Sequence, residues 1–113
     1  MDPATPTMRI ERWDPRRDGP FSERALQQKL EARGFVVTLR TFPAGAVIAG
    51  QPQDRERLAA VISGLVKLTL DDDSAILRDG DIAAIPAGAS GRFEALGAMP
   101  ARCGEAVRPA DSD

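Results

Sequence analysis

The stretch Gly80-Asp81-Ile82-Ala83-Ala84-Ile85-Pro86-Ala87-Gly88-Ala89-Ser90-Gly91 has the pattern of a short β-strand between two tight turns. Residues 82–85 are continuously apolar, too short a run for a helix, and Asp-Gly and Pro-x-Gly breakers flank them. Glycine adopts positive φ without a steric cost, so a tight corner tolerates it where other residues are strained. The stretch predicts a strand over 82–85 with a turn at each end.

The chain beyond residue 34 repeats this texture of short apolar runs and breakers. Pro43-Ala44-Gly45, Ser63-Gly64 and Gly97-Ala98-Met99-Pro100 are examples of the breakers. Strands are expected at about 35–42, 46–49, 57–63, 65–70, 75–77, 82–85, 91–96 and 101–107. So many short, evenly spaced strands favour a β-barrel or β-sandwich.

One short helix is predicted before the strands. Ser22 has the position of an N-cap, and Phe21 and Leu26 have the spacing of a hydrophobic staple. Leu26 and Leu30 share one face of this helix, and Gly34 is placed to end it.

The spacing of glycine and proline resembles the two motifs of the cupin superfamily. In that family the first motif is Gly, five residues, His-x-His, three or four residues, Glu, six residues and Gly. The second is Gly, five residues, Pro-x-Gly, two residues and His. Gly45 and Gly64 match the ends of the first motif, and Gly80, Pro86 and Gly88 match the second. The resemblance implies an all-β, cupin-like double-stranded β-helix (jelly-roll) barrel with one short N-terminal helix.

The resemblance covers residues from about 11 to 108, because the segment Arg12-Trp13-Asp14-Pro15 is also similar to the N-terminal arm of short bacterial cupins. We therefore expect one barrel domain at 12–108. Residues 1–11 and 109–113 are rich in Pro, Asp, Ser and Ala and are expected to be flexible tails.

The residues at the family's metal-ligand positions are all different in this chain, which contains no histidine. Gln51 and Gln53 stand in place of His-x-His, Arg57 in place of Glu, and Gly91 in place of the last His. Amide oxygens are weak ligands for first-row metals, and a guanidinium repels a divalent cation. We expect no metal and no cofactor.

The resemblance implies that the same residues line a pocket inside the barrel. Side chains alternate along a strand, so Gln51 and Gln53 are expected to share its inward face, with Arg57 and Gly91 as further candidates. Buried amide and guanidinium groups need partners, which a small polar or anionic molecule could supply. The alternative is that Arg57 turns to solvent or pairs with a carboxylate of Glu56, Glu94 or Glu105.

Three functional classes remain open on the sequence alone. The first is a metal-independent cupin that binds a small polar or anionic molecule. The second is a metal-free isomerase or cyclase, which would need an Asp or Glu of raised pKa because the chain has neither His nor Tyr. The third is a non-catalytic cupin with a structural role in assembly.

Composition limits the partners. With 15 basic and 17 acidic residues the net charge is −2, which gives no electrostatic basis for binding nucleic acid or an anionic membrane.

No apolar stretch resembles a signal peptide or a membrane span, so a cytoplasmic location is expected. A homodimer is expected, because small barrels gain core by pairing. Cys103, the single cysteine, is expected to be a buried small hydrophobe.

Overall fold

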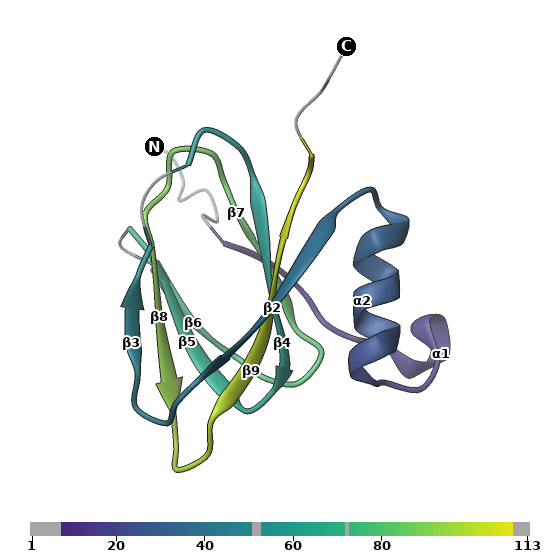
Figure 1. Cartoon of the computed structure of the whole chain (residues 1–113), viewed down its shortest axis with the longest axis horizontal. Helices are drawn as coiled ribbons and strands as arrows, with labels where there is room; N and C mark the ends of the chain where they lie inside the picture. Colours follow the sequence, from purple (N-terminus) through teal and green to yellow (C-terminus); the bar gives the residue numbers. More distant parts are fainter. Residues whose placement is uncertain (1–7, 51–52, 72, 110–113) are drawn as a thin grey trace, which may run out of the picture.

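The structure is a computed structural model that describes residues 8–50, 53–71 and 73–109. Its elements are β1 (Arg9–Glu11), α1 (Pro15–Asp18), α2 (Glu23–Ala32), β2 (Val36–Phe42), β3 (Val47–Ala49), β4 (Arg57–Ser63), β5 (Leu65–Leu70), β6 (Asp73–Leu77), β7 (Ile82–Ile85), β8 (Gly91–Leu96) and β9 (Ala101–Val107). A five-stranded sheet has the order β1-β7-β4-β9-β2, and a four-stranded sheet has the order β3-β8-β5-β6. Both helices lie to one side, beyond the five-stranded sheet (Figure 1).

Strands β2 to β9 lie within two residues of the predicted positions at each end. The largest difference is β6, which begins at Asp73 rather than at residue 75, since Asp73 and Ser74 continue the pairing with Leu70 and Thr69. Ladder hydrogen bonds come from the backbone, so polar side chains at a hairpin end do not stop the pairing. The prediction of an all-β fold with a short helix before the barrel is confirmed.

Strand β4 is the centre of the five-stranded sheet and is covered on both faces. It pairs with β7 on one side and with β9 on the other. Ala59 and Val61 belong to the core between the sheets, whereas Leu58 and Ile62 pack in the cluster that includes α2. A strand with two covered faces has no polar alternation, which explains the continuous apolar run 58–62.

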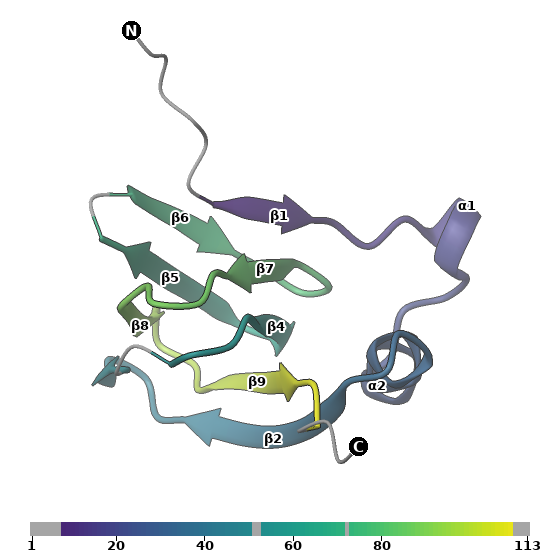
Figure 2. The ribbon, with the colours of Figure 1, turned by 90° about the horizontal axis from the view of Figure 1, so that it is seen from above.

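The four-stranded sheet closes the other side of the barrel. Val66, Leu68 and Leu70 of β5 alternate with more exposed residues and are 0–1% exposed. Together with Leu77 of β6 and Ile85 of β7 they form the main apolar core. The view from above shows this layer, with β5, β6 and β8, facing the layer that contains β2, β4 and β9 (Figure 2).

Helix α2 covers the outer face of the five-stranded sheet. The Ser22 hydroxyl accepts a hydrogen bond from Ala25 N at 3.0 Å, which confirms the predicted N-cap. Leu26 and Leu30 are 1% exposed and lie against the sheet cluster. Gly34 follows the helix at φ +91°, as its predicted position after the last turn requires. No helix within the described ranges is long and apolar enough to cross a membrane.

The structure extends the paired strands further toward the N-terminus than the sequence leads us to expect. Residues 9–11, which the composition assigns to a tail, form β1 and pair with β7, with Arg9 opposite Ala84 and Glu11 opposite Ile82. A three-residue strand with one apolar side chain is too short for a periodicity to appear in the sequence.

Helix α1 is also absent from the sequence-based prediction. Asp14 caps it and Pro15 occupies its first turn. Residues 1–7 and 110–113 lie outside the described residues.

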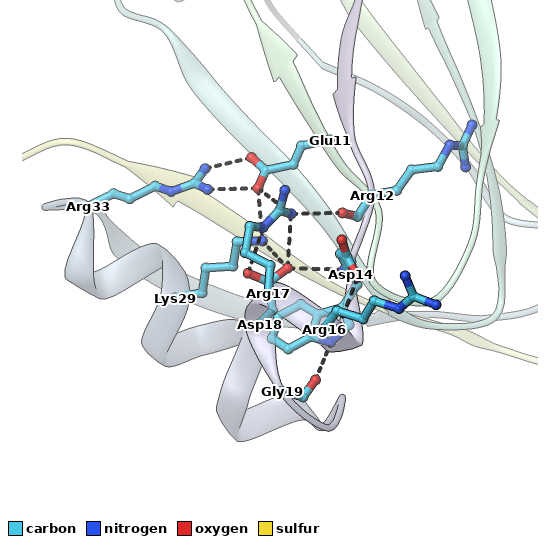
Figure 3. A network of polar contacts seen from close by, with 10 residues as sticks. Glu11, Arg12, Asp14, Arg16, Arg17, Asp18, Gly19, Lys29 and Arg33 are labelled. Atoms are coloured by element: carbon cyan, nitrogen blue, oxygen red, sulfur yellow. Dashed lines mark hydrogen bonds and ion pairs between the residues drawn. The ribbon is translucent and has the colours of Figure 1, made fainter.

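A network of ion pairs joins β1, α1 and α2 (Figure 3). Arg33 donates to Glu11 through both terminal nitrogens at 2.8 Å, and Lys29 Nζ lies 2.8 Å from both Glu11 Oε2 and Asp18 Oδ2. Arg17 also bonds to Asp18, at 3.0 Å. The hydrogen bonds from Arg33 lower the pKa of Glu11 to about 2, with Lys29 as a further cause. The network attaches the N-terminal arm to the helix that covers the barrel.

Candidate functional site

A cavity of about 230 Å³ lies inside the barrel between the two sheets. Both sheets and the segment after β3 contribute side chains to it. Its lining residues are Arg40, Phe42, Ile48, Ala49, Gly50, Gln53, Arg57, Ala59, Ala60, Val61, Val66, Leu77, Ile85, Phe93, Cys103, Gly104 and Glu105. We treat this cavity as the candidate site because it combines an apolar wall with a small set of polar groups.

Arg57 is the most unusual of these residues. It is the first residue of β4, lies opposite Ile85 of β7 and Val107 of β9, and is 7% exposed. Its Nε and Nη2 atoms are buried and have no hydrogen-bond partner among the residues that the structure describes. A buried donor without a partner loses its bonds to water and gains nothing in return. Arg57 thus lines the cavity and carries two donors that are unsatisfied among the described residues.

The third nitrogen of Arg57 has a weak partner. Arg57 Nη1 lies 3.5 Å from Glu105 Oε2, at the outer limit of a hydrogen bond. Arg40 Nη2 lies 3.7 Å from Glu105 Oε1. The two arginines carry two positive charges and Glu105 carries one negative charge, so this cluster has one excess positive charge. Both contacts are too long to hold Glu105 tightly.

The rest of the lining is largely apolar. The Phe42 and Phe93 rings are stacked at 6.4 Å between centroids with 24° between their planes. Ile48 of β3 lies opposite Phe93 in the sheet register, and Ile85 and Val66 extend the wall into the core. The cavity therefore has a charged part and an apolar part.

The structure brings only some of the predicted pocket residues together. Arg57 and Gln53 line the cavity, although Gln53 is exposed overall, and its backbone carbonyl accepts a hydrogen bond from Gly88 N at 2.7 Å. Strand β3 ends at Ala49, so the strand alternation expected to turn Gln53 inward does not reach it. Gln51 lies outside the described residues.

Gly91 is buried but is not one of the lining residues. A Cβ atom at this position would meet Leu70, Leu68 and Ile85 at 3.4–3.9 Å, so the backbone there faces the packed core. The Gly91 carbonyl accepts a hydrogen bond from Gly50 N at 2.6 Å. Its role in the described structure is therefore in packing and in the contact between the two motifs.

Two polar lining residues, Arg40 and Cys103, are missing from the sequence-based prediction of the pocket. Glu105 is named there only as a possible partner of Arg57, and the structure places its carboxylate 3.5 Å from Arg57 Nη1. Cys103 and Glu105 have the same parity on β9, and Arg40 has the same parity as Phe42 on β2. The alternation of side chains along these strands places such residues on one face of each strand. It does not say whether that face is the inner or the outer one. Cys103 is half-buried at the edge of the core, and burial raises the pKa of its thiol to about 11.

No group of three or more His, Cys, Asp or Glu side chains with the geometry of a metal site lies within residues 8–50, 53–71 and 73–109.

A second groove, of about 380 Å³, lies on the outside of the barrel and is lined by residues of β1, β4 and β7. Two of its three arginines already have partners, because Arg33 binds Glu11 and the Arg108 guanidinium lies 4.4 Å from the centre of the Phe35 ring. The barrel cavity is the better candidate.

No protein-family model and no curated protein matches this sequence. Solved structures do match the fold. The cupin domain of Cnp3 from Schizosaccharomyces pombe is 15% identical with a TM-score of 0.59, and the match covers 65% of this chain and 54% of that one. This chain thus spans about half the length of that domain.

Two bacterial structures match over more of their length. A Cupin_2 domain of an XRE family transcriptional regulator from Enterobacter cloacae is 13% identical with a TM-score of 0.62, covering 93% of this chain and 99% of that one. A DUF861 family protein from Thermotoga maritima is 17% identical with a TM-score of 0.56, covering 87% and 96%. At these identities the matches show the fold alone, and the predicted cupin fold is confirmed.

Proposed function

We propose that this protein is a metal-independent cupin domain that binds a small polar or anionic molecule in the barrel cavity. The observation that carries the proposal is the pair of buried Arg57 donors, Nε and Nη2, without a partner among the described residues. A bound acceptor would supply the hydrogen bonds that the folded chain leaves unmade there.

The charge of the cavity supports an anion rather than a cation. Arg40 and Arg57 outnumber Glu105 among the charged lining residues. A divalent metal placed at Arg57 would meet a permanent positive charge, and the amide of Gln53 is a weak ligand for first-row metals. The donor set of this cavity therefore suits an acceptor with negative charge.

The two alternative functions have less support. Glu105 is the one carboxylate among the described lining residues, and its side chain is 36% exposed and lies beside two guanidinium groups. A metal-free isomerase or cyclase would need a desolvated carboxylic acid beside Arg57. A purely structural barrel would be expected to fill its interior with side chains, whereas this one keeps a cavity of about 230 Å³.

Isothermal titration with acetate, benzoate, succinate and phosphate tests the proposal. We expect at least one of these anions to bind the native chain and to lose about 30- to 150-fold in affinity in Arg57→Ala, because a charge-assisted bond contributes about 2–3 kcal/mol. Arg55→Ala is the matched control, since Arg55 is exposed and two residues away. Removing Arg57 also removes a buried guanidinium with two unpaired donors, so Arg57→Ala should remain folded.

Binding of none of the four anions by the native chain would contradict the proposal. Equal affinity in the native chain and in Arg57→Ala would also contradict the proposal.

The homodimer expected from the sequence is a further proposal, and sedimentation velocity at micromolar concentration tests it. A monomer alone under those conditions would contradict the dimer without affecting the binding proposal.

A further inference from the structure

We infer that the ligand is a small monocarboxylate with an apolar body, its carboxylate bound to Arg57 and its body packed near Phe42, Phe93 and Ile48. This inference rests on the proposed function and narrows it to one chemical class. It comes from the geometry of the free guanidinium edge, the charge balance around it, and the composition and size of the remaining cavity.

The two free donors of Arg57 belong to one edge of the guanidinium. Nη1 faces Glu105, and Nε and Nη2 are the unpaired atoms. Their N–H bonds point in nearly the same direction, which is the side-on fork that a carboxylate accepts with its two oxygens. An alcohol or an amide carbonyl offers a single acceptor oxygen, which both donors would have to share in bent and therefore weaker hydrogen bonds.

The charge of the cluster selects a single negative charge. Arg40, Arg57 and Glu105 together carry one excess positive charge, and Glu105 is already within 3.5 Å of Arg57. A monocarboxylate neutralises that excess. Phosphate esters and dicarboxylates carry close to two charges at neutral pH and would add repulsion from Glu105.

The remaining wall favours an apolar body. The stacked pair Phe42 and Phe93 lines the cavity with Ile48, Val66 and Ile85, and these residues offer no polar side-chain atom. A hydroxylated or charged body would lose bonds to water without replacing them. A flat or compact hydrocarbon group satisfies this wall by burial alone.

The volume limits the size of the ligand. At ~30 Å³ per water molecule in the liquid, a cavity of about 230 Å³ has room for seven or eight waters. That space accommodates a small organic molecule such as benzoate. It lies below the range of roughly 300–1,000 Å³ typical of drug-sized ligands.

Isothermal titration at pH 7.5 with five probes tests the inference: benzoate, acetate, benzamide, terephthalate and phosphate. We expect benzoate to bind at least 10-fold more tightly than each of the others. Acetate lacks the apolar body, benzamide lacks the charge, and terephthalate and phosphate carry more charge. Arg57→Lys keeps the positive charge but not the fork, and should weaken benzoate binding at least 10-fold.

A matched pair of variants on β3 tests the apolar part. Ile48 lines the cavity, whereas its neighbour Val47 is 55% exposed on the other face of the strand. Ile48→Ala should weaken benzoate at least 5-fold and leave acetate unchanged, and Val47→Ala should change neither. Thermal unfolding of each variant confirms that it is folded before titration.

The outcomes separate this inference from the proposed function. If acetate or phosphate binds as tightly as benzoate and depends on Arg57, the ligand class is wrong and the anion-binding function stands. Benzamide binding as tightly as benzoate would overturn the assignment of a carboxylate to the ligand. An unchanged benzoate affinity in Ile48→Ala would overturn the placement of the apolar body near Ile48. If no anion binds the native chain, both proposals fail.

Discussion

Arg12 Nη1 donates a hydrogen bond to Asp81 Oδ2 at 2.8 Å, so a residue of the N-terminal arm pairs with a buried carboxylate 69 positions later in the chain. Asp81 is 2% exposed and also accepts a bond from Arg78 N at 3.0 Å. The pair attaches the arm to the turn that precedes β7. The arm is therefore part of the folded domain.

Replacing Arg12 by alanine should destabilise the protein. The change leaves the buried Asp81 carboxylate without its counter-ion, and hydrogen bonds to charged groups contribute about 1.5–3 kcal/mol. Urea denaturation of the native chain and Arg12→Ala measures this difference. Arg24→Ala, an exposed position on α2, is the control and should change the free energy of unfolding by less than about 0.5 kcal/mol. Equal stability of all three proteins would contradict the role given to the pair.

Gly80→Ala should be strongly destabilising because two effects add. Gly80 has φ +89°, and a Cβ atom there would lie 2.6 Å from Trp13 Cβ, whereas Gly97 has φ +79° with nothing within 4 Å of an added Cβ. We expect about 1–2 kcal/mol for Gly97→Ala from the backbone alone. Gly80→Ala should cost about 1–3 kcal/mol more from the clash. Similar losses in the two variants would show that Trp13 moves away freely.

The stability contributed by Glu11 should depend on pH. Its pKa is about 2 in the folded chain, against 4.5 for an unperturbed glutamate, so the unfolded chain takes up this proton first as the pH falls. The contribution is fully present above about pH 4.5 and is lost as the pH falls toward 2. The difference in unfolding free energy between the native chain and Glu11→Gln should therefore shrink from pH 7 to pH 3. Glu31→Gln, exposed on α2, serves as the control, and a difference that does not vary with pH would contradict the assignment.

Cys103 should report occupancy of the cavity. Its pKa of about 11, against 9.0 for an unperturbed thiol, means about 100-fold less thiolate at pH 8 and slow alkylation by iodoacetamide. Saturating benzoate should slow the reaction further in the native chain but not in Arg57→Ala, because Cys103 and Arg57 line the same cavity. Mass spectrometry follows the reaction, and no other thiol competes since the chain has a single cysteine. Alkylation as fast as that of N-acetylcysteine would contradict the buried thiol.

The purified protein should carry no stoichiometric first-row transition metal. Gln51, Gln53, Arg57 and Gly91 occupy the positions where the resembling family has three imidazoles and a carboxylate, and none of these residues is a strong ligand. Elemental analysis for Fe, Mn, Zn, Ni and Cu, after dialysis without chelator, tests this expectation. About one equivalent of any of these metals per chain would contradict it.

The sequence predicts which residues belong to the site, but it does not give the direction in which each of them faces. The motif position of Arg57 predicts a pocket residue, and Arg57 lines the cavity. The motif position of Gly91 predicts the same, but Gly91 faces the core because the start of β8 packs against Leu68 and Leu70. Motif spacing locates a residue along the chain, whereas its direction depends on the neighbouring strand.

The sequence by itself determined strands β2 to β9, the capped helix α2 and the turn glycines, because these depend on local signals such as alternation, an N-cap hydroxyl and positive φ. Only the tertiary structure decided that β1 joins β7, and that Glu105 is the candidate carboxylate that contacts both Arg57 and Arg40. Arg57 and Glu105 are 48 residues apart, and they meet because β4 pairs with β9. Contacts of that kind depend on strand register across the sheet, which no local pattern in the chain specifies.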